Sequence, residues 1–443
     1  MWIYGHQNDI DRSIELSEVV IVSGSRTAIG SFGGALKDVP VCDLGSLVIR
    51  NVLTRVDLRP RPSAKLLGYG PKALANDVCD MEELHNKWPD NLKDVEVDEV
   101  IMGCVYPQGQ RQNVVRRAAI FAGMPKETPA YGLNKLCGSG MEAVVTASQK
   151  IMAGDAEVIL AGGMDSMSNV PYALPRARWG YRMDVGGKAE FYDLLIWDAL
   201  MEGFHDYHMG VTSENIAAKY GITREEQDKL ALMSHQRALA AIKSGVFKQE
   251  IVPVMIRQRK GDPIAFDTDE RPMETSLEKL TKLPSAFIKN GTVTAGNSSG
   301  LNDAAAAVLL MSNKKAKAMG LEPIVKIKAH ASAGVDPAYM GLGVIPAVWK
   351  VLEKAKLTIK DLDIIELNEA FAAQALGCLR ELPFDMNKVN TLGSGISLGH
   401  PVGATGTRLL VTMGNEMKRR NLKYGLATMC IGGGMGIAMI VER

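Results

Sequence analysis

The sequence predicts an α/β fold in which helices cover a mostly parallel β-sheet. Short apolar runs alternate with longer segments of helical periodicity, which is the order that strand–helix–strand units produce. The later part of the chain repeats several features of the earlier part. The chain has 443 residues, 46% of them hydrophobic and 23% charged, so it is long enough for two or three globular domains.

Seven apolar runs are predicted to be buried strands, because each is short and mostly apolar. They are residues 19–22, 99–102, 158–161, 305–311, 324–329, 364–367 and 435–441. Strands of this kind are typical of a sheet that helices cover on both faces.

Three amphipathic segments between these runs are predicted to be helices. In 141–152 the apolar residues fall on one face, and Gly154 follows as a C-terminal stop. The segment 223–243 opens with Thr223 and carries Glu226 three residues later, which is the pattern of a capping box. A third helix, about 402–419, follows a Gly-rich turn.

A faint internal repeat relates the two ends of the chain. Leu-Cys-Gly-Ser-Gly at 136–140 precedes a helix, a strand and Gly-Gly-Met at 162–164. Leu-Gly-Ser-Gly at 392–395 precedes a helix and Gly-Gly-Met at 433–435. Either Gly-rich turns coincide by chance, or two related halves meet at a seam. In the second case an active-site crevice is expected at the carboxyl ends of the strands.

Two stretches interrupt the strand–helix order. Residues about 167–299 form a polar stretch with several Arg and Met residues, which predicts an inserted subdomain. Residues about 55–95 contain four prolines and little periodicity, which predicts a surface excursion. The predicted domains are residues 1–166, completed by about 300–322, then the inserted 167–299, and finally 323–443.

Composition argues against several classes of protein. The formal net charge of +1 gives no sign of a nucleic-acid partner or a membrane surface. Residues 1–18 lack the apolar core of a leader, and no run of about 18 uncharged apolar residues predicts a membrane span. The six cysteines are scattered without a CxxC pair, which argues against a disulfide framework or a zinc site. We therefore expect a cytoplasmic protein with no metal and no permanently bound cofactor.

Cys137 is the first candidate for chemistry. It stands just before the predicted helix, where the positive end of the helix dipole and unpaired N–H groups favour a thiolate. Gly138 and Gly140 beside it allow close approach by a substrate or another part of the chain. The alternative is a buried structural cysteine.

His400 and Cys430 lie in two further Gly-rich turns. The proline after His400 keeps this residue out of helical geometry, so its ring can project from the turn as a base beside a thiol, or instead bond to backbone. Cys430 precedes three glycines that begin at Gly432, whose N–H groups are free to face an oxyanion. A Gly-Gly-Gly run is also common in ordinary tight turns.

Two weaker candidates complete the set. Asn368 follows the strand 364–367, where its amide can orient a water molecule or cap a helix. The small-residue loop from Ala295 to Gly300 leaves room for a bulky ligand. Claisen chemistry needs a nucleophile, a base for a proton alpha to a thioester and two oxyanion sites, and the residues above supply these roles together.

Taken in order, these motifs resemble the thiolase family. They are Asn-Lys-Leu-Cys-Gly-Ser-Gly at 134–140, Asn-Glu-Ala-Phe at 368–371, Gly-His-Pro at 399–401 and Cys-Ile-Gly-Gly-Gly at 430–434, with Arg-Thr-Ala-Ile-Gly-Ser-Phe at 26–32 and Tyr-His-Met-Gly at 207–210. The resemblance covers about 19–56 and about 96–443. No single motif decides it; the ordered set does.

The resemblance implies a five-layered α/β/α/β/α fold of two similar halves, with the inserted 167–299 as a loop domain that binds CoA. It implies Cys137 as the acylated nucleophile, His400 as its activator and Cys430 as the carrier of the alpha proton. The N–H groups of Cys137 and Gly432 would form one oxyanion hole, and His400 with a water held by Asn368 the other. The implied CoA and acyl pocket residues are His208, Met209, Ala295, Ser299, Met340 and Phe371.

The runs at 368–371 and 207–210 look most like acetoacetyl-CoA thiolases, which implies an acetyl-CoA C-acetyltransferase that uses CoA thioesters in either direction. Such proteins are usually dimers or tetramers, and 176–182 falls in the loop that tends to build the tetramer. The alternatives are a broad-range 3-ketoacyl-CoA thiolase of β-oxidation, a non-catalytic thiolase-like scaffold subunit, and a ketoacyl carrier-protein synthase, which Cys430 disfavours.

The chain departs from the family pattern at three places. Asn-Thr-Leu-Gly-Ser-Gly at 390–395 replaces Asn-x-Asn-Gly-Gly-Ala, so the wall under His400 is expected to differ. In the family an arginine often follows Asp-Glu-x-Pro, but here Arg271 precedes Pro272 and Met273 follows it. Arg271 is therefore left out of the expected CoA contacts. The segment about 57–95 is longer than the family's connection.

Overall fold

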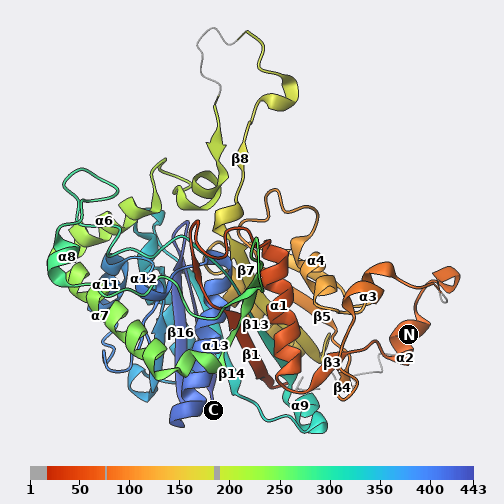
Figure 1. Ribbon diagram of the computed structural model, residues 1–443. Coiled ribbons are helices and arrows are strands. Elements are labelled where there is room, and N and C mark those ends of the chain that lie inside the picture. Colours follow the sequence, from red (N-terminus) through yellow and green to blue (C-terminus); the bar gives the residue numbers. More distant parts are fainter. Residues whose placement is uncertain (1–16, 75–76, 184–189) are drawn as a thin grey trace, which may run out of the picture.

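A large mixed sheet runs through the computed structural model, with helices on its faces (Figure 1). The structure describes residues 17–74, 77–183 and 190–443. Within them the strand order is β15-β16-β17-β14-β1-β13-β7-β5-β6. In addition, β10 (Ile251–Val252) pairs with β1, and β2 (Gly30–Ser31) pairs with β13. The central strands are β1 (Val19–Thr27), β5 (Glu99–Gly103), β6 (Ala130–Leu133), β7 (Val158–Ser166), β13 (Asn302–Ser312), β14 (Val325–Gly334), β15 (Ile364–Leu367), β16 (Tyr424–Ile431) and β17 (Met435–Glu442).

All seven predicted strands are present, but the prediction of a mostly parallel sheet is wrong. Among the main strands, only the pairs β5–β6, β5–β7 and β15–β16 are parallel, whereas β13 and β17 run antiparallel to both of their neighbours. An apolar run buried on both faces looks the same in either direction. The sequence pattern therefore predicts that these strands are buried, but it does not predict the direction in which each strand runs.

Two halves of the same topology make up the sheet. In the first half, β5 pairs parallel with β7, β7 pairs antiparallel with β13, and β13 pairs antiparallel with β1. In the second half, β15 pairs parallel with β16, β16 pairs antiparallel with β17, and β17 pairs antiparallel with β14. Asp98 and Asp363 precede the equivalent strands β5 and β15. Each carboxylate accepts two backbone N–H groups beside the neighbouring strand. The internal repeat is therefore a structural duplication, and β1 and β14 join its halves.

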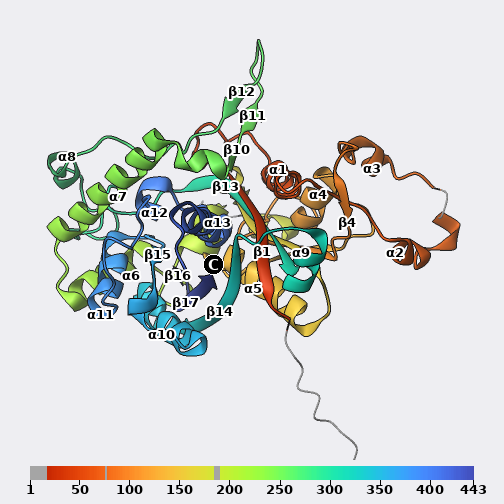
Figure 2. The same ribbon diagram turned by 90° about the horizontal axis from the view of Figure 1, so that it is seen from below.

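Five layers result from this arrangement. Helices α1 (Val41–Thr54) and α4 (Val114–Phe121) lie on the outer side of the first half, and α10 (Val344–Ala355) covers the second. Between the two halves lie α5 (Ser139–Ala153) and α13 (Val402–Arg420), which contact each other and strands of the sheet. Figure 2 shows α13 near the centre of the molecule, with α10 and α1 on opposite sides.

The predicted helices and their end signals are confirmed. Helix α5 ends at Gly154, which adopts the left-handed conformation with φ 82°. Helix α7 (Arg224–Ser244) begins after Thr223, and the Thr223–Glu226 capping box is formed. Helix α13 spans the predicted segment after the Gly-rich turn.

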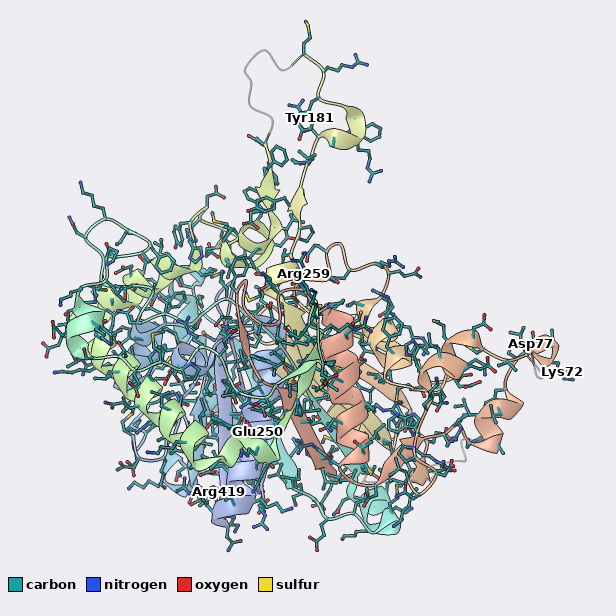
Figure 3. All side chains as sticks on the ribbon, viewed as in Figure 1. Lys72, Asp77, Tyr181, Glu250, Arg259 and Arg419 are labelled. Carbon is teal, nitrogen blue, oxygen red and sulfur yellow. The ribbon has the colours of Figure 1, made fainter. Side chains whose placement is uncertain are left out.

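The inserted stretch 167–299 holds further helices and short hairpins. It includes α6 (Met209–Tyr220), α7, α8 (Leu277–Thr281), the pair β8 (Tyr172–Ala173) and β9 (Tyr192–Asp193), and the pair β11 (Val254–Ile256) and β12 (Ile264–Phe266). An arm beyond β8 stands away from the body, with Tyr181 far from the sheet (Figures 1 and 3). The domain boundaries proposed from the sequence stay a prediction.

The excursion about 55–95 does project from the body, and it holds more structure than the sequence indicated. Strands β3 (Leu58–Pro60) and β4 (Lys93–Val95) pair at its base, and it carries the short helices α2 (Ala64–Gly68) and α3 (Asp80–His85). Lys72 and Asp77 lie at its far end (Figure 3). Residues 1–16, where the sequence predicts no leader, lie outside the described residues. Within the described residues, no helix has the length and apolar character to cross a membrane.

Candidate active site

A two-chambered cleft lies where the halves meet the inserted stretch. The inner chamber, of about 60 Å³, contains Cys137 and seven other predicted site residues: His208, Met209, Ser299, Met340, Phe371, His400 and Gly432. The outer chamber, of about 290 Å³, contains Ala295. The two chambers share part of their lining, including His208, Phe371 and His400. Asn368 and Cys430 lie behind this lining and are buried.

The turn before α5 places Cys137 at the inner chamber. Leu136 has a positive φ of 48°, and the Ser139 hydroxyl accepts the N–H of Lys135, which closes the turn. A Cβ on Gly138 would lie 2.4 Å from the Ile431 side chain, so glycine is required for this close approach. The sequence of turn and helix therefore brings the Cys137 thiol beside the Gly-rich turn that follows β16.

The protonation state of Cys137 differs from the sequence expectation. Burial raises the pKa of the Cys137 thiol to about 11, although hydrogen bonds from the N–H groups of Gly432 and Cys137 itself lower it. The helix N-terminus was expected to favour a thiolate, but loss of hydration outweighs it. At neutral pH the free protein therefore holds a neutral thiol, which needs a base beside it to become a nucleophile.

His400 has the tautomer that a base requires. Thr405 Oγ1 donates its hydrogen to the Pro401 carbonyl at 2.8 Å, so it can only accept from His400 Nδ1, 2.7 Å away. The ring hydrogen is therefore on Nδ1, and Nε2 keeps its lone pair. The backbone N–H of His400 donates to Asn302 Oδ1 at 2.9 Å, which fixes the turn.

Burial also keeps the His400 ring neutral. It lowers the pKa of His400 to about 3, and the nearby Arg408 cation acts in the same direction. Gly399, at φ 110°, precedes the ring, and a Cβ there would lie 2.6 Å from Asn302. The Gly-His-Pro turn thus supplies an unprotonated imidazole in a buried site.

Asn368 lies at the end of β15 beside this ring. Its amide nitrogen is 3.4 Å from His400 Nε2, while its side-chain oxygen is buried with no hydrogen-bond partner. A buried amide oxygen without a partner is a site for an ordered water molecule. This geometry fits the water-holding role that the family resemblance implies.

The altered segment 390–395 packs under Asn368 rather than leaving a gap. Asn390 accepts the Leu367 N–H at 2.8 Å and donates to the carbonyl of the same residue and to Glu369. Ser394 donates to the Leu367 carbonyl at 3.0 Å. The unusual run therefore holds the end of β15 by hydrogen bonds.

Cys430 is the penultimate residue of β16 and lies behind Cys137. It is 1% exposed, and burial raises the pKa of its thiol well above the ordinary value, with Cys137 close enough to add to the shift. The three glycines after Ile431 include Gly433 and Gly434, both at positive φ near 76–77°. This turn directs the Gly432 N–H at the Cys137 sulfur.

An aromatic stack forms one wall of the cleft. The His208 ring stacks on Phe287 with centroids 4.7 Å apart, and Phe287 meets Phe371 edge-on at 5.9 Å. His208 Nδ1 accepts the Gly210 N–H at 3.0 Å, which leaves Nε2 to carry the hydrogen. A Cβ on Gly210 would lie 2.2 Å from the Phe287 ring. The Tyr-His-Met-Gly motif therefore begins α6, and its glycine leaves room for the Phe287 ring.

Several residues that line the cleft were not predicted from the sequence. Apolar walls of the inner chamber come from Val105, Leu136, Ala199, Leu200 and Val402. Single apolar residues like these belong to no sequence motif that would indicate a site. Phe287 and Arg271 line the outer chamber, although Arg271 was left out of the expected contacts. Its guanidinium donates to the carbonyls of Ile396 and Ser298.

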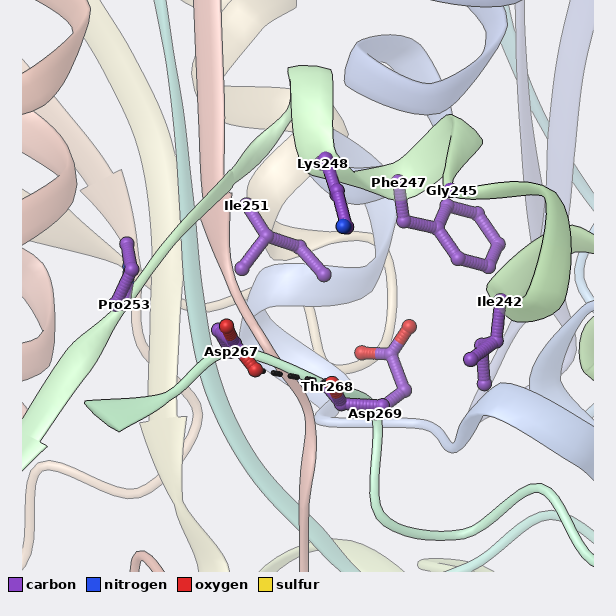
Figure 4. Close-up of a pocket in the computed structure, with 9 residues that line it drawn as sticks. All are labelled: Ile242, Gly245, Phe247, Lys248, Ile251, Pro253, Asp267, Thr268 and Asp269. Carbon is purple, nitrogen blue, oxygen red and sulfur yellow. Dashed lines mark hydrogen bonds between the residues drawn. The ribbon is translucent and has the colours of Figure 1, made fainter. Parts of the chain in front are cut away.

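A separate cavity of about 350 Å³ lies next to β10 (Ile251–Val252), away from the sulfur chemistry (Figure 4). It is lined by Ile242, Gly245, Phe247, Lys248, Ile251, Pro253, Asp267, Thr268 and Asp269. Asp269 is committed to an ion pair with Arg26. This cavity offers no thiol or imidazole. Over the described residues, no cluster of three or more His, Cys, Asp or Glu side chains forms a metal site.

Comparison with protein families identifies the class. The model for the thiolase N-terminal domain matches residues 19–65 and 83–314, and the model for the thiolase C-terminal domain matches 321–443. The chain therefore belongs to the thiolase family, and the fold prediction is confirmed.

Individual relatives and solved structures agree. An acetyl-CoA acetyltransferase of Syntrophomonas wolfei is 49% identical over 427 residues, covering 96% of this chain and 99% of the relative. A beta-ketothiolase of Cupriavidus necator is 47% identical, with 96% and 99% covered. The crystal structure of the Bacillus anthracis acetyl-CoA acetyltransferase matches with a TM-score of 0.86 at 42% identity, with 97% and 100% covered. Human mitochondrial 3-ketoacyl-CoA thiolase matches with a TM-score of 0.84 at 37% identity, with the same coverage.

Proposed function

We propose that this chain is an acetyl-CoA C-acetyltransferase, which condenses two acetyl-CoA to acetoacetyl-CoA and CoA, or catalyses the reverse thiolysis. The observation that carries the proposal is one small chamber containing Cys137, His400 and the Gly432 N–H group. Proteins named acetyl-CoA acetyltransferase that are 48–50% identical to nearly the whole chain support it.

In the first half-reaction, His400 Nε2 takes the proton of the Cys137 thiol. The sulfur then attacks the thioester carbonyl of acetyl-CoA. Negative charge develops on the carbonyl oxygen, where the N–H groups of Cys137 and Gly432 stabilise it. The C–S bond breaks, and His400 returns the proton to the leaving CoA sulfur. Acetyl-Cys137 and CoA result.

In the second half-reaction, His400 Nε2 takes the proton of the Cys430 thiol, and the resulting thiolate removes a proton from the methyl group of another acetyl-CoA. The enolate oxygen accepts hydrogen bonds from the protonated His400 Nε2 and from a water molecule on Asn368. The carbon then attacks acetyl-Cys137, the C–S bond to Cys137 breaks, acetoacetyl-CoA leaves, and the Cys137 sulfur takes the proton from His400 Nε2. Atoms and charge balance without a cofactor, and CoA and its thioesters are the only substrates.

CoA binding is assigned to the outer chamber and its aromatic wall. His208, Ser299 and Phe371 line both the inner chamber beside the thiol and this outer chamber, and Met209, Ala295 and Met340 complete the proposed substrate contacts. The inner chamber, of about 60 Å³, leaves little room beside Cys137, which supports a short acyl group. We further propose a cytoplasmic homo-oligomer, a dimer or tetramer, that binds no nucleic acid.

Thiolysis assays test the activity. Purified protein with CoA should cleave acetoacetyl-CoA, and a sixteen-carbon 3-ketoacyl-CoA should react at least about 100-fold more slowly in kcat/KM. Comparable rates on both would instead make it a broad-range thiolase of β-oxidation.

Cys137→Ser should lose at least about 1000-fold in kcat, because the hydroxyl is a far weaker nucleophile. Unchanged turnover in this variant would contradict the role of Cys137, and no turnover by wild type would favour a scaffold subunit.

A further inference from the structure

Asp165 is a buried carboxylate next to the site that the proposed mechanism does not use. It lies at the end of β7 and is 0% exposed. A buried carboxylate is costly unless its oxygens accept hydrogen bonds. Asp165 has no cationic partner among its hydrogen bonds, and it is satisfied almost entirely by backbone N–H groups.

These N–H groups come from both halves of the molecule. Val105 and Tyr106, which follow β5, each donate to Asp165 Oδ1 at 3.0 Å. Gly403, in the first turn of α13, donates to Oδ2 at 2.6 Å. The Cys104 thiol adds a weak contact at 3.5 Å. One carboxylate therefore joins a loop of the first half to a helix start of the second.

Glycines make this junction possible. A Cβ on Gly163 would lie 1.9 Å from the Gly403 carbonyl oxygen, and one on Gly140 would lie 2.6 Å from the same atom. A Cβ on Gly403 itself would lie 2.5 Å from Asp165 Oδ2. The end of β7, the start of α5 behind Cys137 and the start of α13 therefore converge at this carboxylate.

The tethered segments are walls of the proposed active site. Val105 lines the inner chamber, and Val402, beside Gly403, lines both chambers together with His400. Burial raises the pKa of Asp165 to about 7, while the Tyr106 and Gly403 N–H groups lower it. The Cys137 and Tyr106 side chains lie close enough for its charge to raise their pKa values.

We propose that Asp165 is a positioning residue that sets the spacing of Val105 from Val402 and His400 around the Cys137 thiol. It acts through these segments and does not touch the substrate. This inference rests on the proposed function for its kinetic readout, but the reactivity of Cys137 tests it independently.

The test compares Asp165→Asn, near the C-terminal end of β7, with the control Asp98→Asn. The Asp98 carboxylate accepts N–H groups at the start of β7. Asparagine has the same shape, but its NH₂ group would face backbone N–H donors, so one tethered segment must move. We expect kcat for acetoacetyl-CoA thiolysis to fall by about 10- to 100-fold. KM for CoA should stay within about threefold, because Asp165 makes no hydrogen bond to the aromatic wall of His208, Phe287 and Phe371. The rate of Cys137 alkylation by iodoacetamide should also change at least about fivefold.

Two further variants separate positioning from folding. Asp165→Glu keeps a carboxylate acceptor and should recover most of the lost kcat. Asp98→Asn removes a carboxylate that accepts the Glu157 and Val158 N–H groups at the start of the same strand, so it should lower Tm while leaving kcat and Cys137 alkylation unchanged. If Asp165→Asn does not fold, Asp165→Ser replaces it, since the smaller side chain leaves room for water and places no second donor there.

The outcomes are distinct. Wild-type kcat and alkylation rate in a folded Asp165→Asn or Asp165→Ser protein would overturn the proposal, as would equal kinetic losses in Asp98→Asn. Wild-type protein that cleaves no acetoacetyl-CoA would refute the proposed function instead. In that case an altered alkylation rate in Asp165→Asn alone would still support the positioning role.

Discussion

At the scale of single residues, His400 depends on a neighbour that no motif singled out. The Thr405 hydroxyl is held by the Pro401 carbonyl and so fixes the ring hydrogen on Nδ1. Sequence reasoning found His400 from its Gly-rich turn, but the tautomer depends on a side chain five residues away in the first turn of α13.

Thr405→Val should therefore lower kcat about 100-fold, because the ring loses the acceptor that keeps Nε2 free. Stopped-flow measurement of CoA release during Cys137 acetylation checks this. Thr405→Ser retains the hydroxyl and should stay within about threefold of wild type. Equal rates for the Val and Ser proteins would rule out this role for Thr405.

Gly210 illustrates a residue whose role is purely spatial. Because its Cβ would overlap the Phe287 ring, Gly210→Ala should displace the stack on His208 and raise KM for CoA about tenfold, with a smaller effect on kcat. Gly221→Ala is the matched control at the other end of α6. Gly221 has φ 62° with open space around it, so the change should cost about 1 kcal/mol of stability and leave KM unaltered. Steady-state kinetics with varied CoA distinguish the two.

At the scale of elements, the sequence predicted helices and strands well because periodicity and capping are local. Thr223 with Glu226 and the stop at Gly154 each depend on a few neighbouring residues. Strand direction could not be predicted, since it depends on pairing between β1 and β13, nearly 300 residues apart in the chain. Val105 and Phe287 join the site only through such long-range folding.

The excursion between β3 and β4 is an element that the family model does not match over 66–82. Leu67, Tyr69 and Leu74 are among its exposed apolar residues. Replacing 66–81 with a short Gly-Ser linker keeps Glu82 and its bonds to Lys126.

The shortened protein should keep kcat and KM within about twofold of wild type, because the β3–β4 pair closes the base of the excursion and none of its described residues lines either chamber of the cleft. Thiolysis kinetics and Tm check this expectation. A loss of activity at unchanged Tm would show that the excursion contributes to catalysis.

At the scale of the whole molecule, buried charges lie in the interior close to the interface of the two halves. Arg26 is paired with Glu250 and Asp269 at 2.6–2.7 Å, and all three residues are buried. Glu366 and Arg408 are 3.5 Å apart and otherwise lack hydrogen-bond partners. Sequence reasoning could not anticipate these pairs, because charged residues in apolar runs look like surface residues until the fold is known.

Glu366 gives the unfolding free energy a predictable pH dependence. Burial raises its pKa to about 8, although Arg408 opposes the shift. Because the folded pKa lies above the unfolded one, the stability that this group contributes is fully present below the unfolded pKa and is lost as the pH rises through about 8. Its maximal slope is about −1.4 kcal/mol per pH unit between these values.

Glu366→Gln should remove this slope. Urea unfolding of both proteins at pH 5.5, 7.0 and 8.5 measures it, with each pH compared between the two. The difference in unfolding free energy, wild type minus variant, should decrease steadily from pH 5.5 to 8.5. A difference that stays constant with pH would mean that Glu366 is ionised throughout.

The position of β1 between β13 and β14 also affects how the protein is made. Arg26 pairs with Ala306 of β13, so 280 residues must be added after Arg26 before this residue of its main partner strand exists. At the usual speed of translation this takes roughly 15–60 s. For that time β1 lacks its neighbour β13, and the first half of the sheet cannot form completely. We expect folding to be largely completed after synthesis ends, with chaperones protecting the first strand until then.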